Sequence, residues 1–414
     1  MKIINYSELE KYFFEYKEMP EIESVKQILS DVRVNGDGAA RKYAKQFDGF
    51  DSQSFLVSKE EIKEAYEKVD KKTIDAIKYA SKNISAFAKK QLACLKSFGI
   101  NIGGNIVGQK IVPLQAVGCY VPGGRYPLPS TAIMLVTPAK VAGVKEIIVC
   151  SPKIQPVTIV AADIAGASKI FNVGGVQAIG AMAYGTQTIP KVDKIVGPGN
   201  KYVTAAKKEV YGTVGIDFIA GPSEVLIIAD ESANPAFVAA DLLAQAEHDP
   251  DARANMLTPS KKLAEEVNRQ LEIQLPLLQT RETASLSLEK GRIILVDSLA
   301  VAIDISNRLA PEHLELQVKN PKLLEAKLMN YGSLFIGNYS AEVFGDYCSG
   351  PNHTLPTNGA ACYTGGLSAK DFVKILTFQK TNRNGSGKLI DTASALADAE
   401  GLFAHKKAAE IRRI

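Results

Sequence analysis

Cysteine is scarce in this chain, and its spacing excludes a disulfide framework. Five cysteines occur among 414 residues, an odd number at wide intervals and without a CxxC pair. They are Cys94, Cys119, Cys150, Cys348 and Cys362. Secreted disulfide scaffolds and cysteine-based zinc modules need closely spaced sets of cysteines. We therefore expect reduced thiols in a cytoplasmic protein, most of them buried and unreactive.

The chain also lacks a long apolar run and a concentration of charge of one sign. No stretch is apolar over the length of a membrane span, because Thr, Pro, Lys and Gly interrupt 131–150. Met1–Lys17 contains three glutamates and has no apolar core of a secretory signal. The net charge of +4, with both signs interspersed, favours neither nucleic acid nor a membrane surface as a partner.

What is present is a globular composition with an α/β rhythm. The 414 residues are 46% hydrophobic and 23% charged, which is enough for two or more domains with large cores. Residues 1–97 have helical periodicity, and from residue 105 short β-branched runs alternate with helical segments. A second alternating series follows a boundary near Gly221-Pro222, and Ser386–Ile414 forms a helical tail.

The predicted strands are the short apolar runs of the two series. They are Ile106–Pro113, Val117–Val121, Glu146–Cys150, Lys169–Val173, Lys194–Val196, Glu224–Ala229, Met256–Thr258, Arg292–Val296 and Ser333–Ile336, with a short LELQV run before the last. Strands that alternate with helices of ten to fifteen residues are typical of parallel sheets covered by helices on both faces. Two α/β sheet domains are the natural inference.

The segment Ala244–Ala252, AQAEHDPDA, is the first candidate for chemistry. Gln245 and His248 are three residues apart near the end of a helical segment that starts at Asn234, so their side chains cover one patch of surface. Pro250 ends the helix there. An amide oxygen and an imidazole nitrogen aimed at one point make half of a tetrahedral metal site. The alternative is a solvated helix end.

Histidine is rarer than cysteine, and each histidine has polar neighbours. The four histidines stand in AEHDPD, APEHLE, GPNHTLP and EGLFAH. They are His248, His313, His353 and His405. Together with Gln245 and Asp346, His248 and His405 would suit a zinc site of nitrogen and oxygen ligands without thiolate. Their separation along the chain leaves the geometry of such a site open.

Glu312 and His313 place a carboxylate and an imidazole on adjacent residues after Pro311. Adjacent residues of a regular strand point to opposite faces, so both could act on one substrate only from an irregular turn. The pair could provide a base tuned near neutral pH and a second acid or base. A solvated turn is the alternative.

Glycine-rich turns follow several predicted strands. They are VPGGR (121–125), NVGG (172–175), VGPGN (196–200) and IAGPSE (219–224). Such turns lead into helix N-termini and suit phosphate or pyrophosphate groups. The GxGxxG fingerprint is absent, so tight connections between elements remain the alternative. The residues by themselves thus predict an α/β enzyme and leave a metal and a nucleotide open.

Long motifs of the chain resemble those of the histidinol dehydrogenase family. They are YVPGGR, VGGVQAIGAMAYGT, VGPGNKYVTAAK, GPSEVLI, LLAQAEHDPDA, LAPEHLEL, GDYCSGPNHTLPT and AEGLFAH. Eight co-linear motifs of this length make the resemblance specific. It runs from about residue 20 to the C-terminus. It implies a cytoplasmic enzyme that uses one zinc ion per active site and NAD to oxidise L-histidinol to L-histidine.

The resemblance also implies a role for particular residues. The zinc ligands are Gln245, His248, Asp346 and His405, which also contact the substrate. Ser223, His353 and Glu400 complete the substrate pocket, and Tyr120, Gln177 and Asn200 contact NAD. Glu312 and His313 are the acid/base pair. His313 takes the alcohol proton as hydride passes to NAD, and Glu312 then activates water to attack the bound histidinaldehyde before a second NAD is reduced.

The implied fold consists of two related, incomplete Rossmann-like domains with an aldehyde-dehydrogenase-like arrangement. A helical N-terminal segment (1–21) precedes a discontinuous α/β domain (22–119 and 224–366). A second α/β domain (120–223) is inserted in it, and a helical tail (367–414) follows. The family implies a homodimer in which the partner subunit supplies Glu400 and His405.

Departures from the family pattern are modest. Cys119, Cys348 and Phe403 replace the usual residues of their motifs, and the segment 126–129 differs from the commonest form. None is a proposed ligand or acid/base residue.

Three functions are alternatives to the oxidation of histidinol. The first is oxidation of another polar primary alcohol, such as a sulfonated diol. The others are a zinc hydrolase in which Glu312 activates metal-bound water and a catalytically silent homologue.

Overall fold

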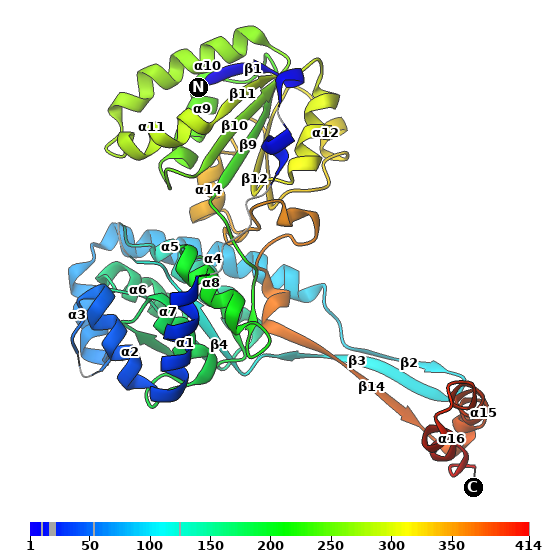
Figure 1. Ribbon diagram of the computed structural model, residues 1–414. Coiled ribbons are helices and arrows are strands. Elements are labelled where there is room, and N and C mark those ends of the chain that lie inside the picture. Colours follow the sequence, from blue (N-terminus) through cyan, green and yellow to red (C-terminus); the bar gives the residue numbers. More distant parts are fainter. Residues whose placement is uncertain (10, 16–21, 53, 124–125, 414) are drawn as a thin grey trace.

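A computed structural model describes residues 1–9, 11–15, 22–52, 54–123 and 126–413. It contains two parallel sheets, each covered by helices, and an antiparallel ribbon that projects from them (Figure 1). The predicted α/β class with parallel sheets is confirmed. Within the described part of the chain, every helix is too short or too polar to cross a membrane.

The six-stranded sheet has the order β1-β11-β10-β9-β12-β13, and all its neighbouring strands are parallel. The strands are β1 Lys2–Asn5, β9 Glu224–Ala229, β10 Arg253–Thr258, β11 Arg292–Leu295, β12 His313–Gln317 and β13 Ser333–Ile336. The helices are α9 Pro235–Ala246, α10 Lys261–Gln274, α11 Arg281–Lys290, α12 Leu299–Leu309, α13 Lys322–Glu325 and α14 Glu342–Tyr347.

Strand β9 explains why this sheet is covered on both faces. Val225 and Ile227 pack into the core beneath α9, α10 and α11. Leu226 and Ile228 point the other way, into the core beneath α12. Successive side chains of a strand alternate between faces, so an unbroken apolar run such as VLIIA needs a layer of helices on each side.

The five-stranded sheet has the order β6-β5-β4-β7-β8 and is also parallel. Its strands are β4 Ala116–Tyr120, β5 Glu146–Cys150, β6 Lys169–Phe171, β7 Lys194–Val196 and β8 Gly215–Ile216. The helices are α1 Glu23–Asn35, α2 Asp37–Tyr43, α3 Lys59–Lys68, α4 Lys71–Ala93, α5 Pro129–Ala142, α6 Pro156–Ala165, α7 Gly175–Tyr184 and α8 Lys201–Val210. One core lies under α1, α2, α7 and α8, and the other under α3, α4, α5 and α6.

The packing differs from the predicted division in two places. The helices within 22–119 were grouped with 224–366, but α1–α4 pack on the five-stranded sheet. Residues 2–5, expected in a helical segment, instead form β1 at the edge of the six-stranded sheet. An amphipathic pattern specifies which face of a helix is buried, and it does not specify which sheet buries it. Of the N-terminal segment, residues 10 and 16–21 lie outside the described residues.

The projecting ribbon is antiparallel and has the order β14-β3-β2. Its strands are β2 Phe98–Ile102, β3 Asn105–Pro113 and β14 Val373–Thr381. At its far end it carries α15 Arg383–Ala399 and α16 Phe403–Glu410, the helical tail (Figure 1). The ribbon leaves large apolar side chains half exposed, among them Ile100, Ile102 and Ile375.

We expect the replacement of Leu257 by alanine to destabilise the six-stranded sheet. Leu257 is fully buried on β10, and removing its side chain should cost about 2–5 kcal/mol of the free energy of unfolding. Urea denaturation measures the change. The control is Leu323→Ala on α13, because Leu323 is 77% exposed and should cost under about 0.5 kcal/mol. Equal losses for the two variants would contradict this assignment of the core.

Candidate functional site

The site residues of the six-stranded sheet lie at the amino ends of its strands. Glu312 stands in a bend just before β12, and His313 is the first residue of that strand. Gln245 is near the end of α9, and His248 follows in the connection to β10. Asp346 lies on α14. A helix that connects parallel strands ends beside the start of the next strand, so these residues meet at one edge of the sheet.

The backbone before β12 is the irregular turn that the Glu312–His313 pair requires. Ala310 ends α12 with a φ of 46°, in the left-handed region that residues other than glycine rarely adopt. This reverses the chain, and Pro311 and Glu312 follow outside any regular element. Both side chains of the pair are buried, at 5% and 4% exposure. The N–H of Glu224 donates a hydrogen bond to Oε2 of Glu312 at 2.9 Å.

His313 is the centre of the cluster. Its Nδ1 lies 3.2 Å from Oε1 of Gln245 and 3.9 Å from Oε2 of Glu312. Its Nε2 lies 3.5 Å from Oδ1 of Asp346. On the other side of that carboxylate, Nε2 of His248 is 3.8 Å from Oδ2. The structure therefore brings Gln245, His248, Glu312, His313 and Asp346 together, although they are spread along a hundred residues of chain.

Glu342 belongs to this cluster and was missed in the sequence. It is fully buried at the start of α14, and its Oε1 lies 3.8 Å from Nδ1 of His313. Neither carboxylate oxygen has a hydrogen-bond partner among the described residues. Glu342 and Asp346 are four residues apart on one helix, and this spacing places two carboxylates on one face. That spacing is the signal that could have found it.

The donor atoms fit a divalent metal ion. Ligand atoms of His248, Glu342 and Asp346 all lie within 4.8 Å of one another. Ligands about 2.1 Å from a tetrahedral zinc ion stand about 3.4 Å apart, close to the 3.8 Å between His248 and Asp346. Imidazole and carboxylate ligands suit zinc. The amide Nε2 of Gln245 is buried without a hydrogen-bond partner among the described residues, and the amide oxygen, the atom that could bind a metal, lies against Nδ1 of His313.

Burial and charge set the protonation of the cluster. Burial raises the pKa of Glu312 and of Glu342 to about 8. Burial lowers the pKa of His313, but the carboxyl groups of Glu342, Glu312 and Asp346 raise it well above the ordinary value. Burial also opposes ionisation of Asp346, but the hydrogen bond and charge of His313 bring the pKa of that carboxyl to about 2. The cluster thus retains exchangeable protons at neutral pH.

The other predicted substrate residues divide between the cluster and the tail. Nδ1 of His353 lies 2.8 Å from the backbone oxygen of Asp346, and burial lowers the pKa of this imidazole. Ser223 immediately precedes Glu224, which bonds to Glu312. Glu400 and His405 are exposed on the tail, at the tip of the ribbon and far from the cluster (Figure 1). Within one chain these two residues do not join the site.

The three predicted NAD contacts all lie at the carboxyl end of the five-stranded sheet. Tyr120 ends β4, and its hydroxyl accepts a hydrogen bond from the N–H of Gly175 at 3.1 Å. Nε2 of Gln177 lies 3.4 Å from Oδ2 of Asp48. Asn200 follows β7 and caps α8 by accepting from two backbone N–H groups. Ligands of open α/β sheets bind at this edge. Of the VPGGR turn, residues 124–125 lie outside the described residues.

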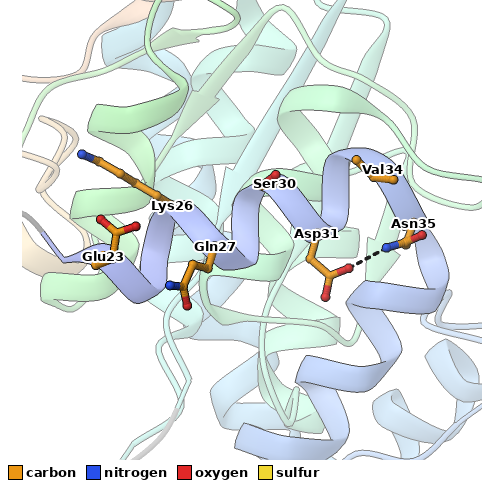
Figure 2. A pocket seen from close by; sticks show the side chains of 7 residues that line it. All are labelled: Glu23, Lys26, Gln27, Ser30, Asp31, Val34 and Asn35. Carbon is orange, nitrogen blue, oxygen red and sulfur yellow. Dashed lines mark hydrogen bonds between the residues drawn. The ribbon is translucent and has the colours of Figure 1, made fainter.

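A shallow surface depression lies apart from these residues, along the exposed side of α1 (Figure 2). Its lining is Glu23, Lys26, Gln27, Ser30, Asp31, Val34 and Asn35, all on one helix. Asp31 accepts a hydrogen bond from Asn35 there, so the depression is the solvated face of an amphipathic helix. It contains none of the predicted site residues.

We expect Glu342 to make the stability of the metal-free protein depend on pH. Its pKa of about 8 exceeds the 4.5 of an ordinary glutamate. The folded protein therefore binds more protons than the unfolded chain between these values, and the free energy of unfolding falls as pH rises through that range. Urea denaturation in the presence of a chelator measures this dependence. The free energy of unfolding should fall less steeply with pH in Glu342→Gln than in the wild type. The exposed control Glu289→Gln should keep the wild-type slope, and a wild-type slope in Glu342→Gln would contradict the assignment.

Comparisons with known proteins identify the family of this chain. A model of the histidinol dehydrogenase family matches residues 15–413. The histidinol dehydrogenases of Aquifex aeolicus and Methanocaldococcus jannaschii are 50% and 49% identical to this chain, and each alignment covers 94% of it and 92% of the relative.

A solved structure gives the same result for the fold. The crystal structure of histidinol dehydrogenase from Elizabethkingia anophelis superposes with a TM-score of 0.94 at 40% identity, covering 100% of this chain and 97% of that one. The family model spans nearly the whole sequence, and close relatives match it over almost their full length. The chain therefore belongs to the histidinol dehydrogenase family of oxidoreductases.

Proposed function

We propose that the protein oxidises L-histidinol to L-histidine in two steps through a retained histidinaldehyde, using zinc and NAD. The observation that carries the proposal is the buried imidazole of His313 between Glu312 and Asp346, with His248 on the far side of Asp346. This arrangement joins acid/base groups to a set of metal donors. Family membership favours histidinol as the alcohol.

Gln245, His248 and Asp346 would hold the zinc ion, together with His405 of the partner subunit. When bound, zinc supplies a Lewis acid that anchors the imidazole and amino nitrogens of the substrate. Ser223 and His353 are the neighbouring polar groups on this chain that would orient the substrate. Multiple anchors hold the reacting carbon in one place, which favours retention of a reactive aldehyde between two oxidations.

His313 accepts the proton of the substrate alcohol in the first oxidation through its neutral form. Because the neighbouring carboxyl groups raise the pKa of this imidazole, it reaches that form by first passing a proton to one of them. Its Nδ1 faces Gln245, Glu312 and Glu342, and its Nε2 faces Asp346, so it can pass that proton into a buried network. Glu312 has a pKa of about 8 because of burial, a value near the operating pH that suits a general base. In the second oxidation Glu312 removes a proton from the water that adds to the aldehyde.

Tyr120, Gln177 and Asn200 would bind NAD at the carboxyl end of the five-stranded sheet. NAD supplies the acceptor for one hydride in each oxidation. The turn after β7 leads into the N-terminus of α8, and the positive end of the helix dipole there favours an anionic group nearby. This placement would provide a dinucleotide site without the usual glycine fingerprint.

The projecting ribbon and tail favour a homodimer. Large apolar side chains are exposed along the ribbon and tail, including Ile102 at 59% and Phe403 at 72%. Exposed large apolar side chains on a projecting element favour an interaction surface. The cluster of one chain lacks Glu400 and His405. In a dimer, these two residues at the end of the ribbon would complete the site of the partner subunit.

The proposal predicts two NADH formed per histidinol consumed. Absorbance of NADH at limiting histidinol measures the ratio, and chelation should abolish the reaction until zinc is restored. A sulfonated diol serves as the comparison substrate. Turnover of that diol with none of histidinol, at full zinc content, would identify a different primary alcohol as the substrate.

In the same assay, His313→Asn should lower kcat by about two to four decades, because the variant lacks the proton acceptor. Binding of NAD should be retained. Unchanged turnover of NAD in His313→Asn would contradict the assigned role. Hydrolytic activity without NAD binding would identify a zinc hydrolase.

Coexpression of His405→Asn subunits with His313→Asn subunits tests whether the tail acts across the dimer. In a mixed dimer the intact cluster of one subunit meets the intact tail of the other. Random assortment should then restore about a quarter of wild-type activity. Each variant expressed alone is the control and should remain at its own low rate. No recovery in the mixture would mean that each tail serves its own chain.

A further inference from the structure

The turn after β7 is hydrogen-bonded to a buried ion pair, and neither residue of this pair is among the predicted site residues. The backbone N–H of Gly197 donates to Oδ2 of Asp217 at 2.7 Å. Nζ of Lys207 donates to the backbone oxygen of the same glycine at 2.8 Å. Lys207 and Asp217 also contact each other. Both polar groups of one residue in the turn are therefore bound to one pair of opposite charges.

Burial makes this pair unlike the other ion pairs of the five-stranded sheet. The side chains of Lys207 and Asp217 are 3% and 1% exposed, whereas those of Lys169 and Glu146 are 43% and 35% exposed. The cost of removing two charges from water offsets most of their attraction, so a buried pair adds little net stability compared with apolar residues. Its two hydrogen bonds to Gly197 point to a role in placing the backbone.

The backbone position that the pair maintains is a crowded one. Gly197 has a φ of 120°, and a Cβ there would stand 2.2 Å from the backbone oxygen of Tyr120. The turn thus lies directly against the end of β4. Three residues later, Asn200 caps α8. Two of the predicted NAD contacts, Tyr120 and Asn200, therefore depend on where Gly197 lies.

Asp217 also stands at the start of the segment that leads to the proposed acid/base residues. Asp217 follows β8, and the segment from it leads to Ser223 and to Glu224 at the start of β9. The N–H of Glu224 donates to Glu312. Asp217 also accepts a hydrogen bond from the N–H of Phe218 at 2.8 Å, which orients the first peptide of this segment.

We propose that Lys207 and Asp217 are positioning residues for NAD, which hold the Gly197–Asn200 turn against Tyr120. The inference rests on the proposed function, since it concerns the NAD site of that reaction. It assigns the pair no contact with substrate or cofactor. Loss of the pair should weaken the binding of NAD, because a turn that is not held in place must be ordered each time NAD binds.

The test is the double variant Lys207→Met with Asp217→Leu. It removes both charges and keeps similar side-chain volumes, so no unpaired charge remains in the core. The Kd of NAD measured by calorimetry and the KM for NAD should both rise about tenfold or more, as expected when a binding turn loses its position. The KM for histidinol should stay within about twofold.

Two further variants make the result specific. Lys207→Met with Asp217→Asn keeps an acceptor for the N–H of Gly197, and should shift the Kd of NAD in the same direction by less. Lys169→Met with Glu146→Gln removes the exposed pair of the same sheet and should leave the Kd of NAD unchanged. The melting temperature of each variant is measured alongside.

The outcomes separate this inference from the proposed function. Wild-type affinity for NAD in either folded core variant overturns the inference, as does an equal rise of both KM values together with a lower melting temperature. A wild-type protein that binds NAD and does not oxidise histidinol contradicts the proposed reaction. In that case the Kd of NAD, measured by calorimetry, still tests the role of the Lys207–Asp217 pair. A selective loss of NAD affinity that is smaller in the asparagine variant supports the positioning role of the pair.

Discussion

The buried imidazole of His313 among the carboxyl groups of Glu312, Glu342 and Asp346 is the interaction on which the rest of the site depends. Charges this deeply buried are tolerated only when opposite charges and hydrogen bonds surround them. The start of β12, the end of α9 and the short helix α14 must therefore meet at one edge of the sheet. The same geometry places His248 beside Asp346, so the proposed acid/base groups and the proposed metal donors share a carboxylate.

The two sheets divide the chemistry between opposite edges. The proposed acid/base and metal-binding groups lie at the amino ends of strands in the six-stranded sheet, and the proposed NAD contacts lie at the carboxyl ends of strands in the five-stranded sheet. The segment 217–223 joins them, with the Lys207–Asp217 pair at one end and Glu224, bonded to Glu312, at the other. The ribbon carries the tail away from both edges, which leaves the site of a single chain without Glu400 and His405 (Figure 1).

Local patterns in the sequence predicted much of this arrangement. Short apolar runs that alternate with helical segments predicted the parallel strands. The spacing of Gln245 and His248 predicted a shared surface at the end of a helix. Long motifs identified the family. Each of these signals depends on residues that are close together in the chain.

The amino-acid sequence by itself determined the α/β class, the family and the chemical character of the site residues, because periodicity and short motifs are local properties. Only the tertiary structure decided that α1–α4 cover the five-stranded sheet, that residues 2–5 pair with β11, and that Glu342 faces His313. It alone also joined Lys207 to Asp217 through Gly197. These contacts link distant segments, and their free energy comes from burial and charge pairing that exist only once the chain has packed.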